Sequence, residues 1–146
     1  MITKTLIDRI FNTASISRWN EFLHPIELTE LDKHAHRAMI AFILAKTLEE
    51  RDGNYDWISL IECIVFELLE KSVLTDIQRP VFDTIKSSDP QFFKQYVISN
   101  LSYDIRKLQR GAVFYDHFNR YLDRDKDLAN TLNLLEFSSF IATQIE

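Results

Sequence analysis

The sequence predicts an all-α protein, a single helical bundle of about six or seven helices over residues 1–146. Only two glycines and three prolines occur in the chain, so the tight turns that join β-strands are scarce. Apolar residues recur at spacings of three and four, which is typical of amphipathic helices. With 46% hydrophobic and 27% charged residues, the chain has the composition of one folded globular domain.

The first predicted helix covers residues 3–14. Its apolar residues follow the helical spacing and are Leu6, Ile7, Ile10 and Phe11. An irregular stretch follows and is interrupted by Pro25, because proline inside a helix removes a backbone hydrogen bond.

The second predicted helix begins after Thr29 and runs to about Arg51. Asp32 stands three residues after Thr29, which is the spacing of a capping box. Gly53 follows Asp52 and precedes Asn54; a glycine at this place favours the left-handed backbone that ends many helices.

The third predicted helix begins near Asp56, and nearly every position from Trp57 to Leu69 is apolar. A helix that is apolar on all sides is normally central and buried. We therefore expect Glu67 and Glu70 to lie inside the core or at its edge.

Four further helices are predicted after Pro80. They cover residues 80–86, 90–100, 103–122 and 127–146. The mixed charges of residues 123–127 predict a solvated turn with no binding role.

Composition narrows the classes of function. The net charge is -5 and basic residues are scattered, which predicts no nucleic-acid binding but leaves a small phosphorylated ligand open. No stretch of 18 uncharged apolar residues occurs, so we expect no membrane span. Cys63 is the only cysteine, and its apolar surroundings predict a buried core residue in a reducing, cytoplasmic compartment.

The two acids of the third helix are the first candidates for a functional site. Glu67 and Glu70 are three residues apart and share a helix face. Buried carboxylates must be neutralised, paired with cations or bound to metal, and functional sites use such clusters. The alternative is that Glu70 reaches solvent while Glu67 pairs with a cation, for which Lys71 and Arg79 are the local candidates.

Histidines offer a second signal. His34 and His36 lie about 200° apart around a helix, so both cannot serve one metal ion, and a structural role for each remains open. We expect His24 and His117 to be structural or solvated.

Arg18 and Trp19 form a third candidate site in the irregular stretch after the first helix. The planar guanidinium group can donate two parallel hydrogen bonds to a phosphate. The alternative is an arginine stacked on its neighbouring tryptophan or held in a surface ion pair.

The order of three segments, "SRW", "LTELDKHAH" and "FELLEKSVLTDIQRPVF", resembles the HD-domain phosphohydrolases, in particular the YfbR-like 5'-nucleotidases. The resemblance implies an all-helical fold, phosphate binding by Arg18 and Trp19, and catalytic roles for Glu70 and Asp76 in positioning or activating the attacking water. Leu74, Thr75, Pro80 and Val81 match the rest of the family's phrase around these two acids.

The chain departs from the family at the metal-binding motif. The family's adjacent histidine and aspartate fall on Phe66 and Glu67, and a phenyl ring cannot bind a metal. The remaining metal ligands implied are His36, Glu67 and Glu136, which would hold Mn, Co, Mg or Zn with fewer imidazoles. A shifted register would use His34, and the other residues near the last expected ligand are Ser139 and Asp116.

Two functional hypotheses follow from this resemblance. The first is a degenerate, weakly active or inactive HD-like domain that is retained as a ligand-binding or scaffolding module. The alternative is a metal-dependent phosphohydrolase acting on nucleotide-like phosphomonoesters. A helical bundle without an ancestral active site is a third reading, and a homodimer is compatible with the first.

Overall fold

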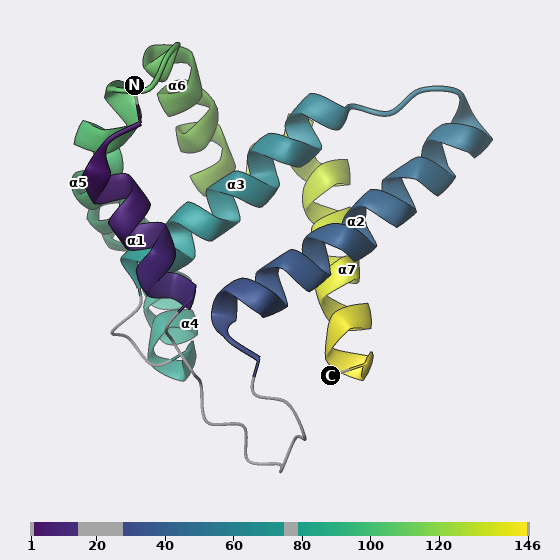
Figure 1. Ribbon diagram of the computed structural model, residues 1–146, viewed down its shortest axis with the longest axis horizontal. Coiled ribbons are helices and arrows are strands. Elements are labelled where there is room, and N and C mark those ends of the chain that lie inside the picture. Colours follow the sequence, from purple (N-terminus) through teal and green to yellow (C-terminus); the bar gives the residue numbers. More distant parts are fainter. Residues whose placement is uncertain (1, 15–27, 75–78, 146) are drawn as a thin grey trace.

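The computed structural model describes residues 2–14, 28–74 and 79–145, which form an all-helical bundle without a strand (Figure 1). This confirms the predicted all-α helical bundle. The α-helices are α1 (Lys4–Ala14), α2 (Glu30–Asp52), α3 (Trp57–Val73), α4 (Arg79–Ser88), α5 (Pro90–Arg106), α6 (Gly111–Leu122) and α7 (Ala129–Ile145), with a 3-10 turn at Lys126–Leu128 before α7.

Helix α2 begins and ends as its sequence predicts. The Thr29 side chain accepts a hydrogen bond from the backbone N–H of Asp32, and the Asp32 carboxylate accepts one from the backbone N–H of Thr29. These two bonds form the capping box. Gly53 ends the helix with a left-handed φ of 83°, a conformation that glycine adopts without steric cost.

Helix α3 lies in the centre of the molecule, between α1 and α2 in Figure 1. At its start, the Asp56 carboxylate accepts a hydrogen bond from the backbone N–H of Ser59. On one side of the helix, Leu60, Cys63 and Phe66 are almost completely buried. The prediction that α3 is buried all round is wrong, because a stripe of apolar side chains on its other side remains exposed.

Two hydrophobic cores meet on α3. The larger core joins α3 to α1, α5 and α6, and its fully buried members include Phe66, Val97, Leu101, Ile105 and Phe118. The smaller core joins the first half of α3 to α2 and α7, and it contains Ala41, Ala45, Leu60 and Leu134. Helix α3 therefore connects both halves of the bundle.

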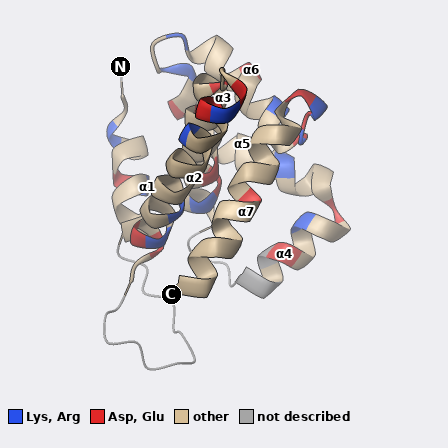
Figure 2. Cartoon of the chain, turned by 90° about the vertical axis from the view of Figure 1, so that its right-hand side faces the viewer, with Lys and Arg blue, Asp and Glu red and all other residues tan. Residues whose placement is uncertain are grey.

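Small side chains let α2 and α7 pack closely. Ala41 and Ala45 of α2 and Ser138 and Ala142 of α7 are all completely buried. Figure 2 shows that α7 is almost free of charge, and Glu136 is its only charged residue. Along most of their contact, α2 and α7 are therefore held together by close packing and not by ion pairs.

The later helix boundaries differ from the prediction. Helix α5 continues to Arg106, and α6 begins only at Gly111. Gly111 lies so close to the end of α5 that a Cβ atom there would stand 2.5 Å from the carbonyl oxygen of Ile105. The turn between α5 and α6 therefore depends on a close approach of the backbone within the turn itself, which helical spacing does not reveal.

The other boundary corrections are smaller. Helix α4 is longer than predicted and ends at Ser88, while the last helix begins at Ala129 after the 3-10 turn. Within the ranges described above, no helix is long and apolar enough to span a bilayer.

Candidate functional site

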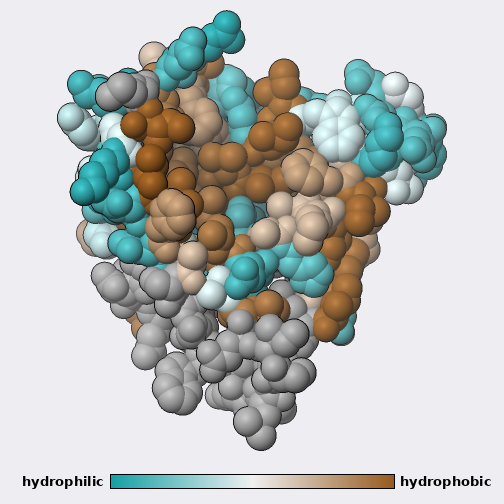
Figure 3. Space-filling view, viewed as in Figure 1, coloured by the Kyte–Doolittle hydropathy of each residue, from teal (hydrophilic) through white to brown (hydrophobic). Residues whose placement is uncertain are grey.

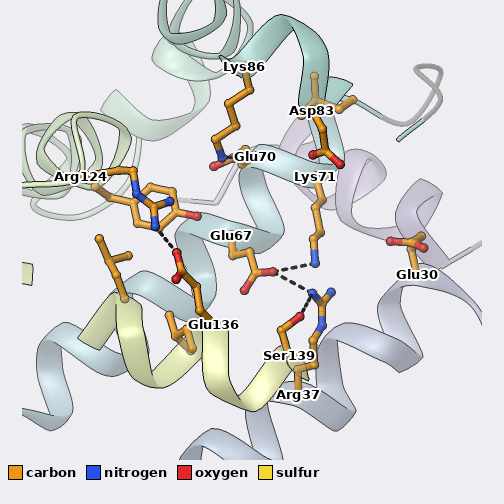
Figure 4. A pocket seen from close by; sticks show the side chains of 14 residues that line it. Glu30, Arg37, Glu67, Glu70, Lys71, Asp83, Lys86, Arg124, Glu136 and Ser139 are labelled. Atoms are coloured by element: carbon orange, nitrogen blue, oxygen red, sulfur yellow. Dashed lines mark hydrogen bonds and ion pairs between the residues drawn. The ribbon is translucent and has the colours of Figure 1, made fainter. Parts of the chain in front are cut away.

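A charged cavity of about 210 Å³ lies where α2, α3, α4, the end of α6 and α7 meet (Figure 4). Acids and bases alternate around it. The acids are Glu30, Glu67, Glu70, Asp83 and Glu136; the bases are Arg37, Lys71, Lys86 and Arg124. Tyr121, Ser139 and a few leucines complete the wall. The two acids of α3 therefore face one shared cavity, as predicted.

Glu67 is held by two cations at the centre of this cavity. Its Oε1 atom lies 3.1 Å from Nη1 of Arg37 and 2.7 Å from Nζ of Lys71. Arg37 also donates a hydrogen bond to Oγ of Ser139 over 3.3 Å, which joins α2, α3 and α7 through one guanidinium group. The prediction of Lys71 as a partner is confirmed, while Arg37 comes from a neighbouring helix.

Burial and the neighbouring charges shift the pKa values of Glu67 and Lys71 in opposite directions. Burial raises the pKa of Glu67, but the positive charges of Lys71 and Arg37 outweigh it and leave that pKa below its ordinary value. Burial lowers the pKa of Lys71, and Glu67 offsets part of this effect. Glu67 is therefore an ionised carboxylate at neutral pH, already neutralised by the protein.

Glu70 is more deeply buried, with only 4% of the residue exposed. Its Oε1 atom accepts a hydrogen bond of 2.5 Å from Nζ of Lys86 on α4, whereas its Oε2 atom has no hydrogen-bond partner within the described part of the chain. The alternative in which Glu70 reaches solvent is therefore wrong, because α4 and α6 cover this end of α3.

Tyr121 stands beside Glu70 on the α6 side of the cavity. Burial, followed by the negative charge of Glu70, raises the pKa of its phenol well above the ordinary value. Tyr121 is therefore a neutral hydroxyl group next to a carboxylate, and it can act only as a hydrogen-bond donor or acceptor.

Glu136 forms the outer wall. It accepts a charge-assisted hydrogen bond from Arg124, and both side chains are more than half exposed. Figure 4 shows this pair at one side of Glu67 and Ser139 at the other. Glu136 is thus near the predicted site but committed to a surface ion pair.

The two histidines of α2 have different environments. His34 is 5% exposed, and its ring lies beside the backbone of Ile64 on α3. Burial lowers its pKa to about 4, against the favourable charge of Glu67, so the ring is neutral at pH 7. His36 is half-buried and does not line the cavity.

The structure does not assemble the metal site that the resemblance implies. Across residues 2–14, 28–74 and 79–145, no group of three or more histidine, cysteine, aspartate or glutamate side chains is arranged to hold a metal ion. Of His36, Glu67 and Glu136, the first lies outside the cavity lining and the other two are paired with cations. The residues present therefore do not fit such a metal.

The other positions named by the resemblance are of two kinds: some lie outside the described residues, and one lies in the larger core. Arg18, Trp19 and Asp76 lie outside the described residues. Phe66, at the place of the family's histidine, packs in the larger core with ring centroids 4.9 Å from Phe114 and 5.2 Å from Phe118.

Sequence reasoning missed two partners of the candidate residues and one further pair. Arg37 and Lys86 reach the cavity from other helices, and no local spacing points to them. His117 of α6 pairs with Glu62 of α3 through Nδ1 and Oε2 atoms 2.7 Å apart. These pairings arise from the tertiary fold.

No protein-family model matches the chain, and neither the curated proteins nor the solved structures contain a match to it.

Proposed function

We propose that this chain is a catalytically silent helical module, degenerate relative to the HD-domain phosphohydrolases, that serves as a scaffold. The observation that carries the proposal is the double ion pair of Glu67 with Arg37 and Lys71. In this function the central cavity is a polar core that keeps α2, α3 and α7 in register.

The ion pair opposes metal-dependent catalysis at this position. A divalent cation bound by Glu67 would have to displace two positive groups that lie within 3.1 Å of the same carboxylate oxygen. The adjacent position, which carries a histidine in the family, is Phe66 and supplies no imidazole. Three protein ligands and an open position are the usual minimum for a catalytic zinc site, and the cavity offers less.

The same pairing limits phosphate binding. Each basic side chain of the cavity already has a carboxylate partner: Arg37 and Lys71 share Glu67, Lys86 has Glu70, and Arg124 has Glu136. A phosphate group would compete with these carboxylates for the cations.

Metal content and turnover test the proposal. The full chain, purified without chelator, is analysed for bound metals and then assayed with phosphomonoesters in the presence of manganese or cobalt. We expect no stoichiometric metal and no metal-stimulated turnover in either the wild type or Glu67→Gln. Metal-stimulated turnover that Glu67→Gln removes would overturn the scaffold function in favour of the phosphohydrolase.

Stability provides the second test. Glu67→Ala leaves Arg37 and Lys71 beside each other without their anion; breaking a buried pair costs about 3–5 kcal/mol. Because roughly a quarter of the Glu67 side chain is exposed (24%), we expect about 2 kcal/mol, or a decrease in Tm of about 4–8 °C.

Glu136→Ala is the matched control for this loss. It removes an acid from the same cavity, but its ion pair is exposed, so the expected change in the free energy of unfolding is within about 0.5 kcal/mol. Equal losses of stability in the two variants would contradict a structural role for the Glu67 ion pair.

A further inference from the structure

One face of the molecule exposes large apolar side chains from three helices. We call it the front face, and it is the face toward the viewer in Figure 3, where hydrophobic atoms extend over α1, α3 and α2. We define it by the exposed large apolar residues of these three helices: Ile7 and Phe11 of α1, Met39, Phe42 and Ile43 of α2, and Ile58, Ile61 and Val65 of α3.

Helical spacing aligns these residues. On α3, Ile58, Ile61 and Val65 follow the three-and-four spacing of one stripe and are 71%, 49% and 37% exposed. The stripe contains no charge. Glu62, the acid nearest to it in the sequence, pairs with His117 of α6.

The flanking helices add charges of both signs to the apolar surface. The exposed stripe of α1 contains Lys4 and Asp8 beside Ile7 and Phe11, at relative positions of three, four and seven. On α2, the stripe of Met39, Phe42 and Ile43 continues to Lys46 and Glu50. The centre of the front face is therefore apolar, and each side contributes charges of both signs, with Lys46 of α2 also paired to Glu49 of the same helix over 2.6 Å.

The size of the surface is that of a protein interface. From their exposed fractions, the eight apolar side chains of the front face leave roughly 700 Å² in water if a fully exposed side chain of this size contributes about 150–200 Å². The largest apolar patch on a typical monomer is about 300–600 Å². A stable interface buries about 800 Å² on each partner.

We propose that the front face binds a second copy of this chain and forms a twofold-symmetric homodimer. A twofold axis brings the same patch together with itself, so that the cation of one rim can meet the anion of the other. A membrane surface is a poorer match, because anionic lipids attract cationic rims and the chain carries a net charge of -5.

The homodimer goes beyond the proposed scaffold function and does not depend on the charged cavity. Its interface is built from α1, α3 and the outer side of α2, while the cavity lies among α2, α3, α4, α6 and α7. A failure of either proposal therefore leaves the other standing.

The molar mass of the full chain in solution tests the dimer. We expect light scattering during gel filtration to give twice 17.3 kDa at concentrations between about 1 and 100 μM, the range of moderate affinities. Ile61→Lys places a charge at the centre of the front face and should weaken the dimer by more than about tenfold.

Val113→Lys is the matched control. Val113 is an exposed apolar residue on α6 with an exposure of 54%, close to the 49% of Ile61, and its substitution should leave a dimer. Circular dichroism checks that helix content is unchanged. If Ile61→Lys loses helix, Ile58→Lys replaces it, because the greater exposure of Ile58 (71%) allows a charge without burial in the monomer.

Three results would overturn the proposal. A wild type that stays monomeric at about 100 μM has no useful self-affinity. A dimer that survives Ile61→Lys, or Ile58→Lys where that variant replaces it, uses another surface. A monomer that binds phosphatidylcholine vesicles, and loses this binding in Ile61→Lys, would assign the front face to lipid.

Discussion

His34 is a titratable residue whose environment differs strongly from that of the free side chain. Its ring is buried between α2 and α3, and the charges that act on it are those of Glu67, Lys71 and Arg37. Glu67 favours the protonated ring, whereas the two cations and burial oppose it. The balance keeps the imidazole neutral in the folded state.

This balance predicts a loss of stability in mild acid. The folded pKa of His34 is about 4, while an unfolded histidine titrates near 6.5. Below about pH 6.5 the unfolded chain therefore binds a proton that the folded chain does not, and the free energy of unfolding falls toward pH 4. At pH 5 the contribution of His34 amounts to about 2 kcal/mol.

Urea denaturation of the wild type and of His34→Leu at pH 7 and pH 5 measures this effect. The variant should lose less stability than the wild type between the two pH values, by about 2 kcal/mol. His36→Gln is the control and should retain the wild-type dependence. An identical pH dependence in wild type and His34→Leu would show that His34 is not the titrating group.

At the scale of single residues, only part of the candidate site could be predicted from the sequence. The placement of Glu67 and Glu70 in one cavity followed from their spacing on a helix, and Lys71 as a partner followed from its position four residues after Glu67. Arg37 and Lys86 could not be predicted, because each reaches the cavity from a different helix. Ion-pair partners of this kind depend on the packing of helices that no local pattern specifies.

At the scale of single helices, the contact between α2 and α7 is made by small side chains. Their contact contains Ala41 and Ala45 on one side and Ser138 and Ala142 on the other, all without exposed surface. Small side chains allow two helix backbones to approach closely, and a close contact leaves no room for extra methyl groups.

A larger side chain in this contact should destabilise the protein. Ala41→Leu is expected to lower the free energy of unfolding by about 1–3 kcal/mol through overpacking. Ala35→Leu, an exposed position on the same helix, should change it by less than about 0.5 kcal/mol. Urea denaturation measures both, and a harmless Ala41→Leu would indicate that α2 and α7 can separate without cost.

Element boundaries were predicted where a local signal exists. Thr29, Asp32 and Gly53 define both ends of α2 through backbone hydrogen bonds and a left-handed residue, and both signals are visible in the sequence. The end of α5 and the start of α6 were wrong, because Gly111 acts through its close approach to Ile105. The exposed stripe of α3 was also missed, since apolar residues on all sides of a helix do not reveal which side has a partner.

At the scale of the whole molecule, the two cores differ in the size of their buried side chains. The larger core buries three phenylalanines, four leucines, two valines and one isoleucine. The smaller core relies on two alanines and two leucines with half-buried neighbours. Less buried apolar surface means less stabilisation of the helices that depend on it.

Hydrogen exchange should therefore be uneven. We expect the amides in the middle of α5, beside Val97 and Leu101, to exchange more slowly than those in the middle of α2 and α7. Leu134→Ala should accelerate exchange in α2 and α7 while leaving α5 unchanged. If α7 proved the slowest helix, or if all helices responded equally, the two cores would be one cooperative unit.

The pairing of α2 with α7 has a consequence for synthesis on the ribosome. Helix α2 emerges early, whereas α7 follows only after α3, α4, α5 and α6 have been made. Until then the alanine face of α2 has only α3 as a neighbour in the smaller core, and α1, α3, α5 and α6 can assemble first, because domains acquire structure as the nascent chain lengthens. The seam between the second helix and the seventh is thus the last to close during translation.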